Sequence, residues 1–370
     1  MKGKSSVPID CCLDCWSDDA RLQQLYTGLA SLHHEGRIRL RQRLIRDPAR
    51  FDLQGVTGGS GFARVTLNGK TVTTYDVGDQ GTINEPLLAK SDIYFKRSFS
   101  EAAKTSSGSA GSRVQPLGLN YPVYRTLPDR FALARAAFFG GWRSRAGQLV
   151  RLVDVAGWCS SLPREKQLDA KPDPGAPPRV LFLVRAWNAE DFPGCTPERI
   201  AQFNAINDMR AACVRALRSA FGPMFTGGFS HTEFARKYYP DALASNSAMT
   251  SKRRYLALLR EHPICVATTG LHQSIGWKMG EYVALSKAVI AEKLHFEVPG
   301  PFADGINYLG FTTPEECVDK VQQLVGSPDR RASLMQANRS YFETWLRPAA
   351  LVWNSLAKAK GMKSAGELTE

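Results

Sequence analysis

The second half of the chain alternates apolar, strand-like segments with helical segments, and this alternation restricts the fold more than any other feature. Residues 179–187 (RVLFLVRAW) are almost continuously apolar, as strands of a parallel sheet are when helices cover both faces. A helical pattern follows over 196–220, and strand-like segments recur at MFTGGF, PICVATTG and AVIAE with helical segments between them. This succession predicts a parallel, doubly wound α/β domain.

The first half of the chain mixes helical and strand signals. The segment ARVTLNGKTVTTYDV places two β-branched stretches around Asn68-Gly69, which predicts a β-hairpin. The segment SDIYFKRSF predicts a strand that carries Lys96 and Arg97 at its carboxyl end. We therefore expect a second, smaller α/β domain in this half.

A segment rich in proline and charged residues, SSLPREKQLDAKPDPGAPP, separates the two halves. A chain of 370 residues is long for one core, so two domains are expected. The predicted boundaries are listed in chain order: an amino-terminal domain over 1–165, a linker over 166–178, a carboxyl-terminal domain over 179–345, and a final helix and tail over 346–370.

The net charge of +13 suits a phosphate-bearing ligand, a nucleic acid or an anionic membrane surface. Residues 125–151 contain six arginines and many apolar side chains, a composition that can bind a bilayer surface. A solvated helix that packs its apolar side on the protein explains the same pattern, and this is the interpretation we expect. No recognised nucleic-acid-binding module is present, so we expect no nucleic-acid partner.

The expectations about cellular location and bound metal depend on sequence patterns that are absent. No window approaches 18 uncharged apolar residues, and the amino-terminal lysines precede no long apolar run, so we expect a cytoplasmic protein. Neither the eight cysteines nor the six histidines show the spacing of a metal site. We expect reduced cysteines in the core and no bound metal.

Polar and charged residues are concentrated directly after the strand-like segment ICVATTG. Ligands of parallel α/β sheets bind at the carboxyl ends of strands, where backbone N–H groups of the following helix can hold a phosphate. If a helix covers 273–286, Gln273 and Glu281 lie about two turns apart on one face. The sequence predicts a site for an anionic, hydroxyl-rich ligand, with these candidates: Gly270, His272, Gln273, Gly276, Lys278 and Glu281.

The stretch from Gln273 to Ile290 resembles a motif of retaining glycosyltransferases with the GT-B fold. That family carries a Glu, seven residues, a second Glu, small residues with Gly and Pro, and then an apolar strand. Here Gln273, seven residues, Glu281 and then YVALSKAVI occupy the corresponding positions. The resemblance implies two Rossmann-like domains that face each other across a cleft, with Glu281 binding the donor ribose and the helix N-terminus contacting the phosphates. It also implies catalysis without a metal ion or other cofactor.

The sequence departs from the family pattern at several positions. Gln273 replaces the first Glu, Ser286 replaces the usual Gly, and Ala288 replaces the usual Pro. After the first donor-domain strand, Arg185 occupies the position of the family's Arg, but Glu190 stands where the family has Lys. The positive charge that meets the phosphates is then assigned to Lys278 and Arg185 or to cations elsewhere in the chain.

The resemblance implies a glycosyltransferase that moves a sugar from a nucleotide-sugar donor to a glycan or lipid-linked acceptor in cell-surface polysaccharide assembly. Three residues of the amino-terminal half are candidates for the acceptor side of the cleft: Asp76, Lys96 and Arg97. We name no catalytic residue. The altered motif leaves open an alternative, in which the chain is a non-catalytic scaffold or binding protein of the same shape.

Overall fold

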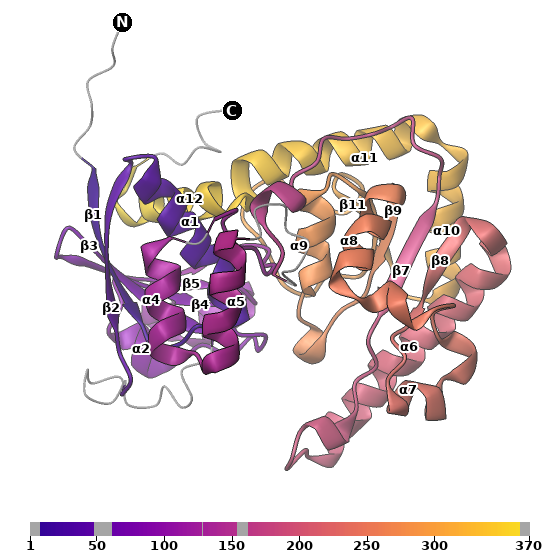
Figure 1. Cartoon of the computed structure of the whole chain (residues 1–370), viewed down its shortest axis with the longest axis horizontal. Helices are drawn as coiled ribbons and strands as arrows, with labels where there is room; N and C mark the ends of the chain where they lie inside the picture. The colour runs from indigo at the N-terminus through magenta and orange to yellow at the C-terminus, as the bar shows by residue number, and fades with distance from the viewer. Residues whose placement is uncertain (1–7, 48–60, 128, 154–161, 363–370) are drawn as a thin grey trace, which may run out of the picture. The chain divides into compact units, whose positions relative to one another are not determined.

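The computed structural model describes residues 8–47, 61–127, 129–153 and 162–362, and the chain divides into two compact units (Figure 1). Unit 1 consists of Met1–Lys166, Glu297–Gly300 and Glu343–Glu370, and unit 2 consists of Gln167–Phe296 and Pro301–Phe342. Each unit has its own sheet and helices, so the predicted α/β class is confirmed. No helix among the described residues is long and apolar enough to span a membrane.

Unit 1 contains a mixed sheet of six strands in the order β2-β1-β3-β4-β5-β6. Strands β3 and β4 form the predicted antiparallel hairpin, and Asn68 and Gly69 in its turn have φ angles of 49° and 69°. Strands β4, β5 and β6 are parallel, so their carboxyl ends meet at one edge. The strands are β1 (Ile9–Cys15), β2 (Ile38–Leu44), β3 (Phe62–Leu67), β4 (Thr71–Asp76), β5 (Ile93–Lys96) and β6 (Val114–Pro116).

Helix α12 packs against α1 in the core of unit 1 (Figure 1). Leu25 and Leu29 of α1 belong to the same buried cluster as Leu351 of α12. A Cβ atom at Gly28 would lie 2.2 Å from the Pro348 carbonyl oxygen, so glycine permits this close approach. The helices of unit 1 are α1 (Gln23–His34), α2 (Glu85–Ala89), α3 (Glu101–Ser106), α4 (Arg130–Phe139), α5 (Trp142–Val153) and α12 (Pro348–Ala359).

Unit 2 contains a fully parallel sheet of five strands in the order β11-β10-β9-β7-β8. The chain starts in β7, adds β8 on one side, and then returns to the other side of β7 for the remaining strands. The order therefore reverses between β7 and β9, and such a switch point is where open α/β sheets bind ligands. The strands are β7 (Val180–Val184), β8 (Phe225–Phe229), β9 (Ile264–Ala267), β10 (Ala288–Glu292) and β11 (Tyr308–Phe311).

Helices α6 and α10 pack on the face of this sheet that presents Val180, Phe182 and Ile290. Helix α10 begins after Thr313, whose hydroxyl accepts a hydrogen bond from the Glu316 backbone N–H and so caps the helix. The helices of unit 2 are α6 (Pro197–Phe221), α7 (Glu233–Tyr238), α8 (Lys252–Glu261), α9 (Trp277–Ala284), α10 (Pro314–Gly326) and α11 (Pro328–Tyr341).

Candidate functional site

Arg210 of α6 holds together the exits of β7 and β9 at the switch point of unit 2. Its guanidinium donates three hydrogen bonds: to the Arg185 carbonyl oxygen at 2.8 Å, to the Thr268 hydroxyl at 3.0 Å and to the Thr269 carbonyl oxygen at 3.0 Å. These bonds fix both loops at the carboxyl edge of the sheet, where a ligand of this fold class binds.

Arg210 is buried without an ion-pair partner among the described residues. Burial lowers the pKa of its guanidinium to about 10, and the charge of Glu292 opposes that shift. Glu292 is the last residue of β10, at the same edge of the sheet. Its carboxylate accepts hydrogen bonds from the backbone N–H and the hydroxyl of Thr269, both at 2.8 Å. The switch point thus contains a buried cation that backbone dipoles and a nearby carboxylate stabilise.

The loop after β9 is a tight turn and not the start of a helix. His272 and Gln273 have φ angles of 57° and 58°, in the left-handed region, and the Gly270 N–H donates to the Ser274 carbonyl oxygen at 2.8 Å. Helix α9 begins at Trp277, so the predicted helical start at 273 is wrong. Gln273 is exposed and lies outside the helix, and it therefore does not share a helix face with Glu281.

Glu281 is buried in α9 and is paired with two side chains of α8. Its Oε1 accepts a hydrogen bond from the Lys252 ammonium at 2.6 Å, and its Oε2 accepts one from the Tyr255 hydroxyl at 2.7 Å. The residue is 4% exposed. The charge of Glu281 adds to burial in raising the pKa of Tyr255 well above its usual value. Glu281 thus joins α8 to α9; a contact with a ribose stays a prediction.

Lys278 is partly buried in the first turn of α9, beside the same tyrosine. Its ammonium lies 4.2 Å from the centroid of the Tyr255 ring, and the Lys252 ammonium lies 5.2 Å from it. Burial lowers the pKa of Lys278 to about 8; the charge of Glu281 opposes the shift, and the charges of Lys252 and Arg210 add to it. The charges of Lys252 and Arg210 therefore act on Lys278, and the Glu281 that pairs with Lys252 opposes them.

The remaining predicted residues of unit 2 lie at the loops around this cluster. Arg185 follows β7, its side chain is 70% exposed, and it forms an ion pair with Asp191 at 3.0 Å. Gly276 is the N-cap residue of α9, and no side chain caps this helix. Ser286 has a φ of 52°, a conformation that favours glycine, which accounts for the Gly of the family pattern at this position.

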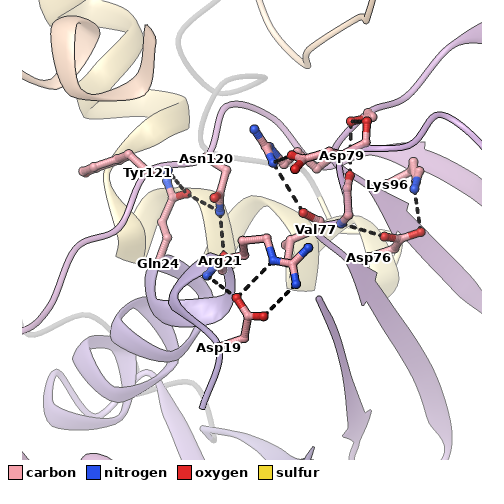
Figure 2. Close-up of polar contacts among 12 residues, drawn as sticks. Asp19, Arg21, Gln24, Asp76, Val77, Asp79, Lys96, Asn120 and Tyr121 are labelled. Atoms are coloured by element: carbon pink, nitrogen blue, oxygen red, sulfur yellow. Dashed lines mark hydrogen bonds and ion pairs between the residues drawn. The ribbon is translucent and has the colours of Figure 1, made fainter. Parts of the chain in front are cut away.

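In unit 1 the candidates Asp76 and Lys96 form a buried ion pair at the carboxyl ends of β4 and β5 (Figure 2). The Lys96 ammonium donates to Asp76 Oδ2 at 2.7 Å, and the Tyr94 hydroxyl donates to the same oxygen at 2.6 Å. Asp76 is 1% exposed and Lys96 is 2% exposed. The pair is satisfied within unit 1, as buried charges must be.

Arg97 continues this polar network one residue beyond β5. It donates to an Asp79 carboxylate oxygen at 2.5 Å and is 4% exposed. Burial lowers the pKa of Arg97, and the charge of Asp79 opposes that shift. A neighbouring ion pair joins Arg21 and Asp19 at 2.7 Å; both residues are labelled in Figure 2. The candidates of unit 1 thus stabilise the strand ends; a role toward an acceptor stays a prediction.

Sequence reasoning missed four residues of the site in unit 2. Lys252 and Tyr255 precede β9 on α8, and no local pattern shows that they face Glu281. Arg210 lies in the middle of a long helix with several other arginines. Glu292 had a usable signal, because it is the charged residue that ends the apolar strand AVIAE.

Comparisons with known proteins give distant structural likenesses and no sequence match. No family model matches the chain, and no curated protein matches it. Among solved structures, an α1,3-fucosyltransferase has a TM-score of 0.42 and 12% identity, covering 92% of this chain and 84% of its own. A glycosyltransferase from Rickettsia africae ESF-5 has a TM-score of 0.39 and 12% identity, covering 91% of this chain and 81% of its own.

HepE from Anabaena, solved in complex with UDP, has a TM-score of 0.38 and 10% identity and covers 75% of this chain. The chain spans 66% of HepE, slightly less than two thirds of its length. The structures similar to this chain thus include proteins named as glycosyltransferases and one with a bound nucleotide. At TM-scores of 0.42 or less the likeness carries no conclusion about function, and the proposals below rest on the residues of this chain.

Proposed function

We propose that this protein is a glycosyltransferase that binds a nucleotide-sugar donor at the carboxyl edge of the sheet in unit 2. The observation that carries the proposal is the excess of positive charge at this edge. Lys252, Lys278 and the buried Arg210 supply three positive charges here. Two carboxylates oppose them: Glu281, which pairs with Lys252, and Glu292, whose charge acts on Arg210. A site with a net positive charge favours an anionic ligand, and a nucleoside diphosphate is such a ligand.

The same groups suit the chemistry of sugar transfer. When the bond between the sugar and the diphosphate breaks, negative charge develops on the leaving phosphate, and fixed cations and backbone N–H groups stabilise it. Lys278 lies in the first turn of α9, so its ammonium and backbone N–H groups of that turn can act on one phosphate. We assign to Lys278 the stabilisation of the leaving group and to Glu281 the positioning of Lys252 and Tyr255.

Retention of the anomeric configuration and independence from metal ions are parts of this proposal that come from the family resemblance. Among the described residues, no group of three His, Cys, Asp or Glu side chains is arranged to hold a metal ion. Both parts have direct tests: the configuration of the product by NMR, and the rate of transfer in the presence of a chelator.

The exposed side of α5 supports a proposal about the acceptor. Trp142 is 75% exposed and Leu149 is 61% exposed, and Arg143 and Arg145 are exposed on the same helix. The expectation that the apolar side packs on the protein holds for Phe131 of α4 and is wrong for these two residues. A basic helix with exposed apolar side chains fits an anionic bilayer. We therefore place the acceptor, a glycan or lipid-linked glycan of cell-surface polysaccharide assembly, at the inner membrane face.

A thermal-shift panel of UDP, GDP, ADP and dTDP, with and without attached sugars, tests the donor site. A ligand that binds the native state raises its unfolding midpoint. We expect a shift with one nucleotide class, its loss in Lys278→Ala, and no loss in Lys237→Ala, which changes an exposed lysine of the same unit. Equal shifts in both variants would remove Lys278 from the site, and a flat panel on folded protein would reject nucleotide binding.

A non-catalytic binding protein is the second candidate, and two observations favour it. Both oxygens of Glu281 already accept hydrogen bonds from Lys252 and Tyr255, and Gln273 replaces the first Glu of the family pattern. Nucleotide binding without release of nucleoside diphosphate, across a panel of donors and acceptors, would favour this candidate. Sugar transfer by the wild-type chain would eliminate it.

A further inference from the structure

A cavity of about 480 Å³ lies in unit 1 beside β6, the edge strand of the sheet. This volume is within the range of roughly 300–1,000 Å³ that is usual for small-molecule sites. The whole lining belongs to unit 1, including the two segments that return to it late in the chain. The lining includes aromatic, apolar and amide side chains: Phe99, Gln115, Leu117, Trp345, Leu351 and Asn354.

Glycine at position 300 shapes one wall of this cavity. Gly300 has a φ of 79°, and a Cβ atom built on it would lie 2.4 Å from Cε2 of the Trp345 indole. Gly300, at one end of the segment Glu297–Gly300, therefore lies directly against the indole ring. The other end of the segment is fixed to unit 1, because the Glu297 N–H donates to the Phe99 carbonyl oxygen at 2.9 Å. The sequence thus builds a wall of defined shape with an aromatic ring in it.

The apolar part of the lining is largely buried and includes aromatic rings. Phe99, Leu117 and Leu351 are 3%, 6% and 4% exposed, and Trp345 is partly exposed. The indole N–H of Trp345 donates to no group among the described residues. An amphipathic ring with an available donor suits a ligand that offers both an apolar face and a hydroxyl group.

The charged groups of the lining balance one another. Lys104 pairs with Glu101 at 3.1 Å, and the lining also contains Lys358 and Glu297. Two cations and two carboxylates leave no net charge to attract a phosphate, and Gln115 and Asn354 add neutral amides. A neutral ligand that carries hydroxyl groups therefore fits better than an anionic one.

We propose that this cavity binds a neutral pyranose unit of the acceptor glycan, with Trp345 contacting its apolar face and donating a hydrogen bond to a hydroxyl. The proposal rests on the proposed sugar-transfer function and names the chemistry of the acceptor. The acceptor sugar is then recognised by an aromatic ring in a cavity with no net charge, whereas the donor is recognised in unit 2 by an excess of positive charge.

Saturation-transfer NMR of the full chain tests the proposal with a panel of methyl glycosides of glucose, galactose, mannose and N-acetylglucosamine and their disaccharides. We expect at least one sugar to bind, with at least tenfold weaker binding in Trp345→Ala and an intermediate loss in Trp345→Phe, which keeps a ring but lacks the N–H. Tyr238→Ala is the control, because it removes an exposed aromatic side chain that is not part of the cavity lining, and we expect unchanged binding.

The outcomes separate this proposal from the proposed function. Absence of sugar binding, or equal sugar binding in wild type and Trp345→Ala, would overturn the assignment of the cavity. The proposed donor site is tested separately, because nucleotide binding is measured by thermal shift. Tighter binding of farnesyl phosphate than of every sugar, lost in Trp345→Ala, would show an anionic lipid ligand and reject the neutral one. Circular dichroism confirms the fold of each variant, and Trp345→Phe remains informative if Trp345→Ala does not fold.

Discussion

Binding of a nucleoside diphosphate is expected to weaken as the pH rises from 7 to 9, because Lys278 loses its proton in this range. Burial holds the pKa of Lys278 at about 8, below its usual 10.5. Two neighbouring groups stay protonated over the same range: burial raises the pKa of Cys265 to about 12 and that of Tyr255 well above its usual value. The Arg210 guanidinium has a pKa of about 10.

The size of the effect follows from the protonated fraction of Lys278. With a pKa of about 8, roughly nine tenths of the lysine is charged at pH 7 and roughly one tenth at pH 9. If the charged form binds the diphosphate, the apparent Kd rises about tenfold, which corresponds to about 1.4 kcal/mol. Lys278 has a lower pKa in the folded chain than in the unfolded chain, so between pH 8 and 10.5 the unfolded chain binds more protons than the folded chain. The contribution of this lysine to the free energy of unfolding therefore rises with pH in that range. Unfolding therefore does not explain weaker binding.

Isothermal titration calorimetry of the wild type and of Lys278→Arg over this pH range measures the effect. Arginine keeps its charge throughout, so its affinity is expected to change less than about threefold. Titration of the nucleotide itself affects both proteins equally and cancels in the comparison. A wild-type affinity that is flat from pH 7 to 9, or one that falls in parallel with that of Lys278→Arg, would refute the assignment of Lys278 to the phosphate.

Three further predictions concern stability, each measured by urea denaturation. Glu281→Ala leaves the buried Tyr255 hydroxyl without its acceptor, and we expect the free energy of unfolding to fall by about 1–3 kcal/mol; an unchanged value would contradict the contact. Gly28→Ala adds a methyl 2.2 Å from the Pro348 carbonyl oxygen, so we expect a loss of about 1–3 kcal/mol, whereas helix propensity alone predicts a gain of about 1. Ser286→Gly relieves a left-handed φ of 52° but removes the hydrogen bond from the hydroxyl to the Ala170 carbonyl oxygen, so we expect the free energy of unfolding to change by less than about 1 kcal/mol. Ser286→Val keeps the backbone strain and loses the hydrogen bond, so we expect a larger loss. A loss below about 1 kcal/mol in Ser286→Val would show that neither the strain nor the bond matters.

The main elements of the fold could be predicted because their signals are local. The hairpin at Asn68-Gly69, the long helix α6 and the N-cap at Thr313 each depend on residues within a few positions of one another. The start of α9 could not be predicted in the same way. His272 and Gln273 adopt left-handed conformations that non-glycine residues rarely take, and nothing in the local sequence requires them.

The candidate site depends on contacts between segments that are far apart in the chain. Lys278 and Glu281 lie on one helix, so their proximity follows from helical spacing. Tyr255, however, reaches Glu281 from α8, and the rotation of one helix relative to another is set by packing on the sheet. Lys96 was expected at a strand end that faces a ligand, but it pairs with Asp76 because a buried lysine needs a partner.

Hydrogen–deuterium exchange of the full chain, with and without the nucleoside diphosphate that gives the largest thermal shift, tests the central claim most directly. We predict slower exchange in the loop and helix over 268–281 and at the start of α8, since these segments carry Lys278 and Lys252. We predict no change at the ends of β4 and β5. Protection confined to those strand ends, with none over 268–281, would contradict a donor site in unit 2.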